Sequence, residues 1–233
     1  MDEKTAKAKV EKRAGKLIAI AQAQLRRGNL EKVLNTVATC GLTPYSANQC
    51  YKSHGLENLL SRVAEQLPFP ETEIAPVEDR VLFYDGFGLG SRGLLTIYLQ
   101  ALCSFRKVTF VTRRDWTPGL EAAISLVESC GGQVCLLEGK KKTEDIRLLQ
   151  KFIAISGARH LFMYANADDV VVTTAFLTVP KDRVRYQINL TDHAFWLGSQ
   201  CADKYIEFLK TGESDYPIEL LKIAGVDMST PEP

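Results

Sequence analysis

The stretch RVLFYDGFGLGSRG, residues 80–93, decides the fold class. Its first part, 81–84, is a short apolar run of the kind that forms a buried strand. Its second part places four glycines within eight residues, and an apolar helical pattern follows at about 94–102. A strand, a glycine turn and a helix in this order are typical of the first unit of a Rossmann-like α/β domain. The four glycines are Gly86, Gly88, Gly90 and Gly93.

Strand and helix patterns alternate after this unit, which indicates a parallel sheet with helices on both faces. Further strands are predicted at 108–111, 134–137, 160–164 and 184–190. One helix is expected to begin at Pro118, with Thr117 as its cap, and to end before Gly131. Another is expected to begin with Thr143 as its cap and to end at Gly157. The sheet should therefore contain about five or more strands.

The segment 170–174 is ambiguous, because its β-branched residues favour a strand. A right-handed crossover between two parallel strands needs a helix between residues 168 and 178. We therefore expect a helix there.

The first 70 residues differ from the rest and predict a small helical region. Helical patterns cover 2–27, 30–39 and 56–67, with a turn at 41–44. These helices could cap the α/β domain or dock a partner. The predicted organisation is a helical region at 1–70, a Rossmann-like domain at 78–208, and a C-terminal segment at 209–233 that serves as a linker toward an absent second domain.

Composition sets the broad class of the protein. The chain is 45% hydrophobic and 24% charged, with a formal net charge of +1, so nucleic acid is not an expected partner. Six cysteines form no Cys-x-x-Cys pair, and no metal site is predicted. The sequence has neither a signal-peptide pattern at its start nor an apolar run that could span a membrane, and a cytoplasmic location is expected.

The glycine turn is the first candidate binding element. Residues 88–93 satisfy the pattern G-x-G-x-x-G, and glycines allow the backbone to approach a ligand closely. Its position is unusual, because Asp85 and two further residues separate the strand from this pattern. The predicted substrate-binding residues here are Gly86, Gly88, Gly90, Ser91, Arg92 and Gly93.

Three interpretations of this turn stay open. The second strand leads into Arg113 and Arg114 rather than a ribose-binding acid. These arginines could hold the 2′-phosphate of NADP, which would suit an oxidoreductase. The turn could also serve only the packing of strand on helix. The third interpretation is a loop that receives a sugar or nucleotide-sugar.

A second candidate element, QINLTDHAFWLG at 187–198, follows the strand predicted at 184–190. Strand ends of this kind meet at the ligand-binding edge of an α/β sheet. His193 is a candidate general base toward a hydroxyl, with Asp192 beside it, and Asn189 and Thr191 are candidate substrate-binding residues. Asp192 could instead cap a helix, His193 could be a half-buried structural histidine, and Phe195 and Trp196 are expected to belong to the core rather than to a sugar-stacking surface.

Taken together, residues 80–93 and 186–198 resemble the N-terminal half of bacterial GT-B glycosyltransferases, of the kind found in Bacteroides-like organisms. The resemblance extends over about residues 15 to 208, and TDHAFWLG is its most specific part. It implies the acceptor-side domain of a metal-independent enzyme, inactive alone, with no cofactor in this chain. The nucleotide-sugar donor would bind mainly to the missing C-terminal domain, and the partner of this domain would be a sugar or glycan acceptor. A non-catalytic binding or scaffold module is the further alternative.

Overall fold

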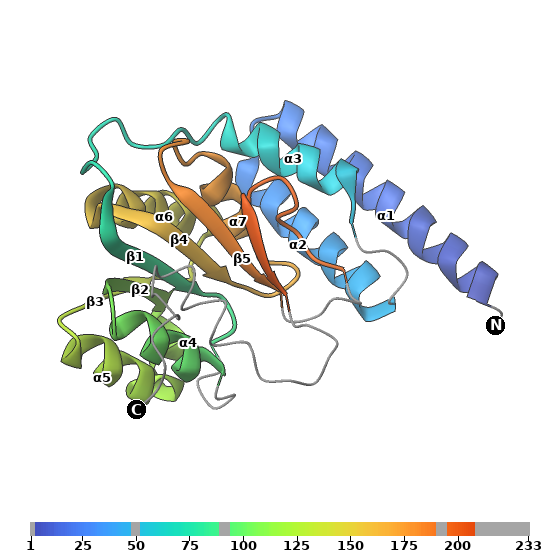
Figure 1. Cartoon of the computed structure of the whole chain (residues 1–233). Coiled ribbons are helices and arrows are strands. Elements are labelled where there is room, and N and C mark those ends of the chain that lie inside the picture. Colours follow the sequence, from blue (N-terminus) through green and yellow to red (C-terminus); the bar gives the residue numbers. More distant parts are fainter. Residues whose placement is uncertain (1–2, 48–51, 89–93, 190–194, 208–233) are drawn as a thin grey trace.

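The computed structural model describes residues 3–47, 52–88, 94–189 and 195–207. At its centre lies a six-stranded, all-parallel sheet with the strand order β3-β2-β1-β4-β5-β6 (Figure 1). The predicted α/β fold class is confirmed. The strands are β1 (Val77–Asp85), β2 (Lys107–Arg113), β3 (Gln133–Leu137), β4 (Ala158–Tyr164), β5 (Val184–Asn189) and β6 (Lys204–Glu207).

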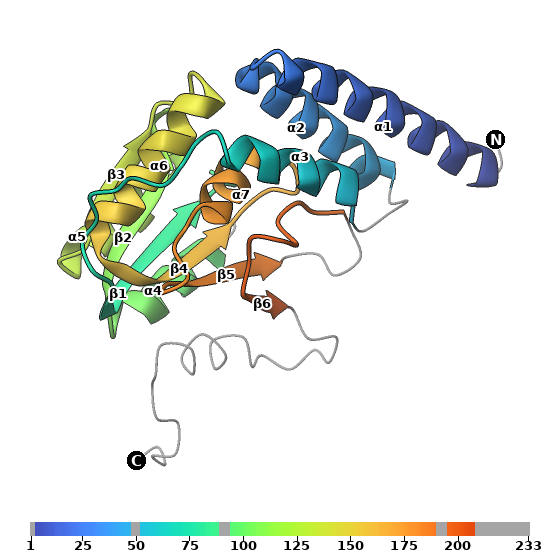
Figure 2. The same ribbon diagram turned by 90° about the horizontal axis from the view of Figure 1, so that it is seen from above.

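Helices cover both faces of the sheet (Figure 2). One face is covered by α4 (Leu94–Cys103) and α5 (Glu121–Ser129), and the other by α6 (Lys142–Ser156) and α7 (Val170–Leu177). Alternate residues of β1 show this division: Val81 and Phe83 pack on the α4–α5 side, whereas Leu82 and Tyr84 pack on the α6–α7 side. Such alternation follows from the two-residue period of a strand.

Three N-terminal helices add a further layer over α6 and α7: α1 (Glu3–Arg26), α2 (Leu30–Ala47) and α3 (His54–Ala64). Their buried side chains, such as Val37 and Leu60, belong to the same hydrophobic cluster as Leu149 of α6 and Phe176 of α7. The apolar stripe that the sequence shows in these helices is therefore used within the chain, against the α/β unit.

The expected end of the second helix near residue 40 was wrong, because α2 continues through the predicted turn to Ala47. Gly41 serves close packing there instead of ending the helix. A Cβ atom at this position would lie 3.4 Å from a ring carbon of Phe195 and 3.5 Å from the Cα of Asp168. A glycine within a helix thus signalled a close approach between elements.

Two expected helix starts also differ. Pro118 lies in a 3-10 helix, η2 (Arg114–Gly119), and α5 begins only at Glu121, because the hydroxyl of Thr117 donates to the carbonyl of Arg114 rather than capping α5. Thr143 is the second residue of α6, not its cap. By contrast, α6 ends at Gly157 with a φ of 61°, and α7 is the helix expected from the crossover rule.

Candidate functional site

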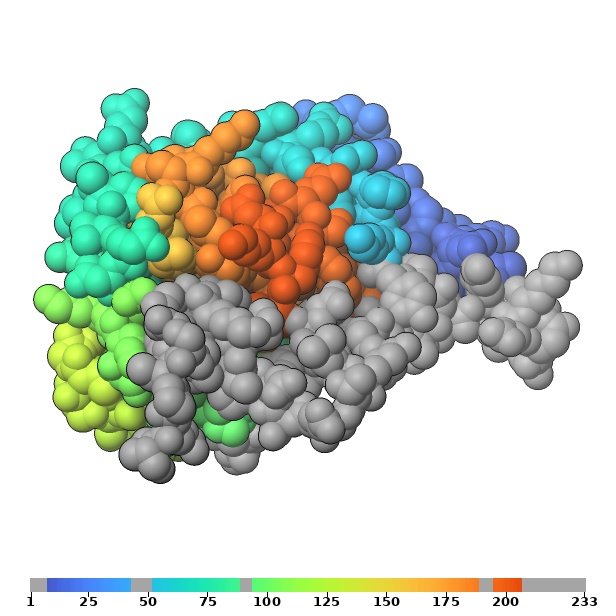
Figure 3. Space-filling view, in the orientation of Figure 1, coloured from blue at the N-terminus to red at the C-terminus, as the bar shows by residue number. Residues whose placement is uncertain are grey.

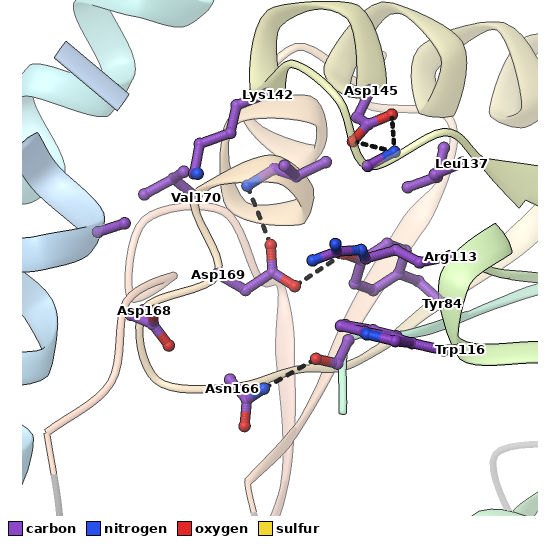
Figure 4. A pocket seen from close by; sticks show the side chains of 14 residues that line it. Tyr84, Arg113, Trp116, Leu137, Lys142, Asp145, Asn166, Asp168, Asp169 and Val170 are labelled. Atoms are coloured by element: carbon purple, nitrogen blue, oxygen red, sulfur yellow. Dashed lines mark hydrogen bonds between the residues drawn. The ribbon is translucent and has the colours of Figure 1, made fainter. Parts of the chain in front are cut away.

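A cavity of about 190 Å³ opens at the carboxyl ends of β1, β2, β3 and β4 (Figure 4). It lies where the strand order reverses, between β1 and β4, which is where ligands bind in open α/β sheets. Ala38 of α2 also lines it, so the N-terminal layer forms part of the wall. The charged and polar side chains that line the cavity are Tyr84, Arg113, Lys142, Asp145, Asn166, Asp168 and Asp169.

Two carboxylates close the turns that follow β1 and β3. Asp85, the last residue of β1, accepts hydrogen bonds from the backbone N–H groups of Phe87 (3.1 Å) and Gly88 (3.2 Å). Asp145 accepts in the same way from Glu138 and Gly139, each at 3.1 Å. Each carboxylate therefore uses the backbone donors of its own turn.

Two more carboxylates occupy the amino ends of the helices that face the cavity. Glu31 of α2 accepts from the backbone N–H groups of Lys142 and Thr143, both at 3.0 Å, and so caps α6 from another helix. Asp169 caps α7, accepting from Val171 (3.0 Å) and Val172 (3.3 Å). Its other oxygen accepts the phenolic hydrogen of Tyr84 at 2.7 Å.

These contacts matter for ligand chemistry, because free N–H groups at glycine turns and helix amino ends are the usual phosphate sites of α/β proteins. In the described turns after β1 and β3, and at the starts of α6 and α7, protein carboxylates already take those donors. A phosphate here would have to displace a carboxylate from its hydrogen bonds. The described rim is therefore better suited to a ligand without phosphate.

Arg113 is held rigidly at one wall of the cavity. Its guanidinium lies 4.5 Å from the centre of the Trp116 ring and pairs with Asp115 through Nε and Nη2. Gly139 lets it approach closely, since a Cβ there would lie 2.9 Å from Nη2. Among the described residues none accepts from Nη1, which leaves this group for a ligand. Gly88, with a φ of 62°, packs directly against the same tryptophan ring.

The two arginines considered for a 2′-phosphate are both engaged by acidic neighbours. Arg113 pairs with Asp115, and Arg114 pairs with Glu138 at 3.0 Å. An oxidoreductase that binds NADP would need both of these pairs to reorganise.

The opposite wall carries hydrogen-bond acceptors. Asn166, two residues after the end of β4, donates through Nδ2 to the carbonyl of Gly86 at 2.9 Å, and this bond fixes the direction of its amide oxygen (Figure 4). The carboxylate of Asp168 is half-buried, and burial raises its pKa. Lys142 donates to the side chain of Asn35 at 2.8 Å and lies close enough to Asp168 to counter this rise. The cavity thus offers acceptors on one side and the Arg113 donors on the other.

The structure places only part of the sequence-predicted site. Gly86 lines the cavity, Gly88 lies beside Trp116, and Asn189 ends β5. The other predicted residues lie outside the described part of the chain: Gly90, Ser91, Arg92, Gly93, Thr191, Asp192 and His193. Their roles stay predictions.

The residues after this gap are anchored by the N-terminal layer. Glu57 of α3, fully buried, accepts from the backbone N–H groups of Gly198 (2.9 Å) and Ser199 (3.2 Å). Phe195 is buried in the core, as expected, whereas Trp196 is half-buried beside Tyr205. Figure 3 shows α3 lying against segment 195–207 on the molecular surface.

Several residues that line the cavity were not predicted as site residues from the sequence. Asn166, Asp168 and Asp169 follow β4, and Lys142 opens α6. Their positions directly after strands, or at the starts of helices, were the available signal, since such positions meet at one edge of a parallel sheet. Within the described ranges, no group of three or more His, Cys, Asp or Glu residues is arranged to hold a metal ion. None of the described helices is both long and apolar enough to cross a membrane.

Burial shifts the pKa of two aspartates beside the cavity, Asp85 and Asp169. It raises the pKa of Asp85 to about 6, although the bonds from Phe87, Gly88 and Thr112 act in the opposite direction. It likewise raises the pKa of Asp169 to about 6, against the bonds from Tyr84 and the start of α7. Both groups therefore change charge in the mildly acidic range.

The raised pKa of Asp169 predicts how the stability of the protein depends on pH. The native state holds its proton up to about pH 6, whereas the unfolded chain releases it near pH 4, so ionisation lowers the free energy of unfolding as the pH rises between these values. Asp169→Asn keeps a capping side chain but removes the titration. We expect the stability of the wild type, relative to this variant, to fall by about 2–3 kcal/mol between pH 4 and pH 7 in urea unfolding. A constant difference over that range would contradict the assignment.

Comparisons with known proteins give little to add to this geometry. No known protein family matches the chain, and no solved structure matches it. A stretch of 36 residues, 16% of the chain, is 61% identical to part of the oligopeptidase PepF of Bacillus subtilis (strain 168). The match spans 5% of the length of that protein. So short a stretch indicates neither the fold nor the activity of the whole chain.

Proposed function

We propose that this chain is the acceptor-side half of a two-domain glycosyltransferase and that its cavity receives a hydroxyl-bearing saccharide. One observation carries the proposal: carboxylates take the backbone donors around the described rim, where a nucleotide would place its phosphates. A neutral sugar needs no such donors. The α/β fold and the resemblance of residues 80–93 and 186–198 to GT-B enzymes support the same function.

The lining chemistry suits sugar hydroxyls, each of which can donate and accept a hydrogen bond. Nη1 of Arg113 can donate to a hydroxyl oxygen, while the amide oxygen of Asn166 and the carboxylate of Asp168 can accept. Trp116 holds Arg113 in place instead of stacking on the sugar. The acidic lining residues outnumber the basic ones, which further disfavours a phosphorylated ligand.

Transfer requires a base that takes the proton of the attacking hydroxyl. His193 is the base predicted from the sequence, with Asp192 beside it. Asp168 is a second candidate on the cavity wall, since burial raises its pKa toward the range in which a carboxylate accepts a proton more readily. The hydroxyl oxygen would attack the anomeric carbon of a nucleotide-sugar held by a second domain, and the nucleoside diphosphate would leave.

Ligand titration tests this function in the chain itself. The sequence contains two tryptophans, so Trp196→Phe leaves Trp116, beside the cavity, as the sole tryptophan, and its emission can be excited selectively. We expect a member of a panel of neutral oligosaccharides to shift this emission and to raise the thermal unfolding midpoint. Asp168→Asn should weaken that binding about tenfold, the cost of a lost hydrogen bond to a charged acceptor.

The matched control is Asp79→Asn. Asp79 is an exposed carboxylate near the amino end of β1, whereas the cavity lies at the carboxyl ends of the strands. It should leave saccharide binding unchanged. NADPH and a uridine diphosphate sugar are titrated in parallel. Tight binding of NADPH that is lost in Arg113→Gln, with no response to any saccharide, would reject the proposed function in favour of an oxidoreductase.

A further inference from the structure

The outer side of α1 carries a row of basic side chains. Lys9, Lys12, Arg13 and Lys16 are all exposed, and the last three follow Lys9 by three, four and seven residues. Side chains with this spacing lie on one side of a helix. Ile20 follows Lys9 by eleven residues, lies on the same side, and is 49% exposed. These five residues form the basic face of α1.

The other side of α1 packs on the protein. Ala21 and Leu25 belong to the hydrophobic cluster that joins the N-terminal layer to α6 and α7, and Ala14 and Leu17 pack against it. In Figure 2, α1 lies along the outer margin of the molecule, with α2 and α3 between it and the α/β unit. The basic face is therefore presented outward by a helix that is anchored through its apolar side.

The positive charge of this helix is not balanced locally. Residues 8–27 contain six basic residues and one acidic residue, a net charge of +5. The whole chain has 29 basic and 28 acidic residues, so the rest of it has 23 and 27, a net charge of −4. Within the described ranges, no carboxylate forms an ion pair with Lys12, Arg13 or Lys16. Such an uneven distribution of charge along a chain points to an anionic partner for the basic end.

We propose that the basic face of α1 docks the protein on a lipid bilayer that contains anionic phospholipids. Phosphate oxygens of the headgroups accept hydrogen bonds from the ammonium and guanidinium groups. Each basic side chain near such a surface strengthens attachment about fivefold. Ile20 adds an apolar contact at the level of the headgroups, as in helices that lie along a membrane surface.

The composition of α1 favours a lipid surface over a nucleic acid. The helix contains no Phe, Tyr or Trp that could stack on bases. An exposed isoleucine among basic side chains can enter the interfacial region of a bilayer, whereas a phosphate backbone offers it no apolar contact. The helix is 24 residues long, about 36 Å, so its basic face can lie along a flat surface.

Sedimentation of the full chain with lipid vesicles tests the proposal. Vesicles of half phosphatidylglycerol and half phosphatidylcholine are compared with vesicles of phosphatidylcholine alone. We expect binding to the anionic vesicles only, and at least tenfold weaker binding in about 0.5 M than in about 0.1 M salt, because salt screens exposed charges. This comparison uses the wild-type protein, so it does not depend on the folding of a variant.

Two sets of substitutions locate the contact. The triple variant K12Q/R13Q/K16Q should bind the anionic vesicles about a hundredfold more weakly, since it removes three charges from the basic face. Glutamine has nearly the helix propensity of lysine and arginine, and circular dichroism checks that the helices are kept. The matched control, K107Q/K151Q/K181Q, removes the same charge from exposed lysines outside α1 and should change binding less than fivefold.

The apolar part of the contact is tested by Ile20→Ser. About half of this side chain is available for burial, so the variant should bind roughly fivefold more weakly, and this loss should persist at high salt.

Equal binding to the two kinds of vesicle would overturn the proposal, and so would wild-type binding by K12Q/R13Q/K16Q. Tighter binding to an oligonucleotide than to anionic vesicles would also overturn it and assign the basic face to a nucleic acid. These outcomes are independent of the proposed function, because no residue of α1 lines the cavity.

Discussion

On the proposed function, the variant His193→Ala is expected to lower turnover of the complete enzyme by about 10²–10⁴-fold, the usual contribution of a general base. The measurement is sugar transfer from a nucleotide-sugar to the saccharide identified by titration, in the enzyme that contains both domains. Loss of the base should reduce kcat more than it raises KM, because the proton moves in the transition state. The acidic limb of the pH–rate profile, which reports protonation of the base, should disappear with it.

His54→Ala is the matched control, since this exposed histidine begins α3 and is not among the residues that line the cavity. It should leave turnover and the pH profile unchanged. Near-normal turnover of His193→Ala would remove this histidine from the mechanism. Asp168→Asn, assayed beside it, would then show whether the carboxylate on the cavity wall is the base.

The fold was predictable because its signals are local and repeated. The strands β1 to β4 each contain an apolar run, and Gly157 ends α6 in the left-handed conformation that glycine favours. The crossover rule decided 170–177 correctly against the strand propensity of its valines and threonines. The sixth strand, 204–207, is only four residues long at the sheet edge and was too short to show a periodic pattern.

The site was less predictable, because its contacts join residues far apart in the sequence. The cap of α6 comes from Glu31, more than a hundred residues earlier, so Thr143 only looked like the cap. Gly41 looked like a helix end but allows α2 to pack against residue 168. Rules based on neighbouring sequence give Thr143 and Gly41 a role within their own helix. In the structure, contacts with distant segments determine what these residues do.

The N-terminal layer is, for the same reason, part of the site's construction. Glu31 of α2 holds the start of α6, and Glu57 of α3 holds Gly198 and Ser199, beyond the predicted base. Both carboxylates accept backbone hydrogen bonds that their target segments cannot satisfy alone. Docking of a partner through these helices stays a prediction, and it would have to use their outer surfaces.

The glycine turn after β1 gives the second large effect: Gly88→Ala is expected to destabilise the protein by roughly 4 kcal/mol. Gly88 has a φ of 62°, in the left-handed region that costs alanine about 1–2 kcal/mol. Its methyl group would also overlap the Cγ and Cδ2 atoms of Trp116, and such overpacking adds about 1–3 kcal/mol. Urea unfolding of the two proteins gives the difference.

Gly131→Ala separates the two causes, because Gly131 has nearly the same φ, 71°, but no heavy atom lies within 4 Å of the added Cβ. It should cost only the backbone part, about 1–2 kcal/mol. If both variants lose the same free energy of unfolding, the Trp116 ring moves aside without an energetic penalty. If the ring is displaced, Arg113, which rests on it, loses its place at the cavity wall, and saccharide binding should fall in Gly88→Ala but not in Gly131→Ala. The glycine turn would then act on the ligand through the tryptophan and arginine behind it.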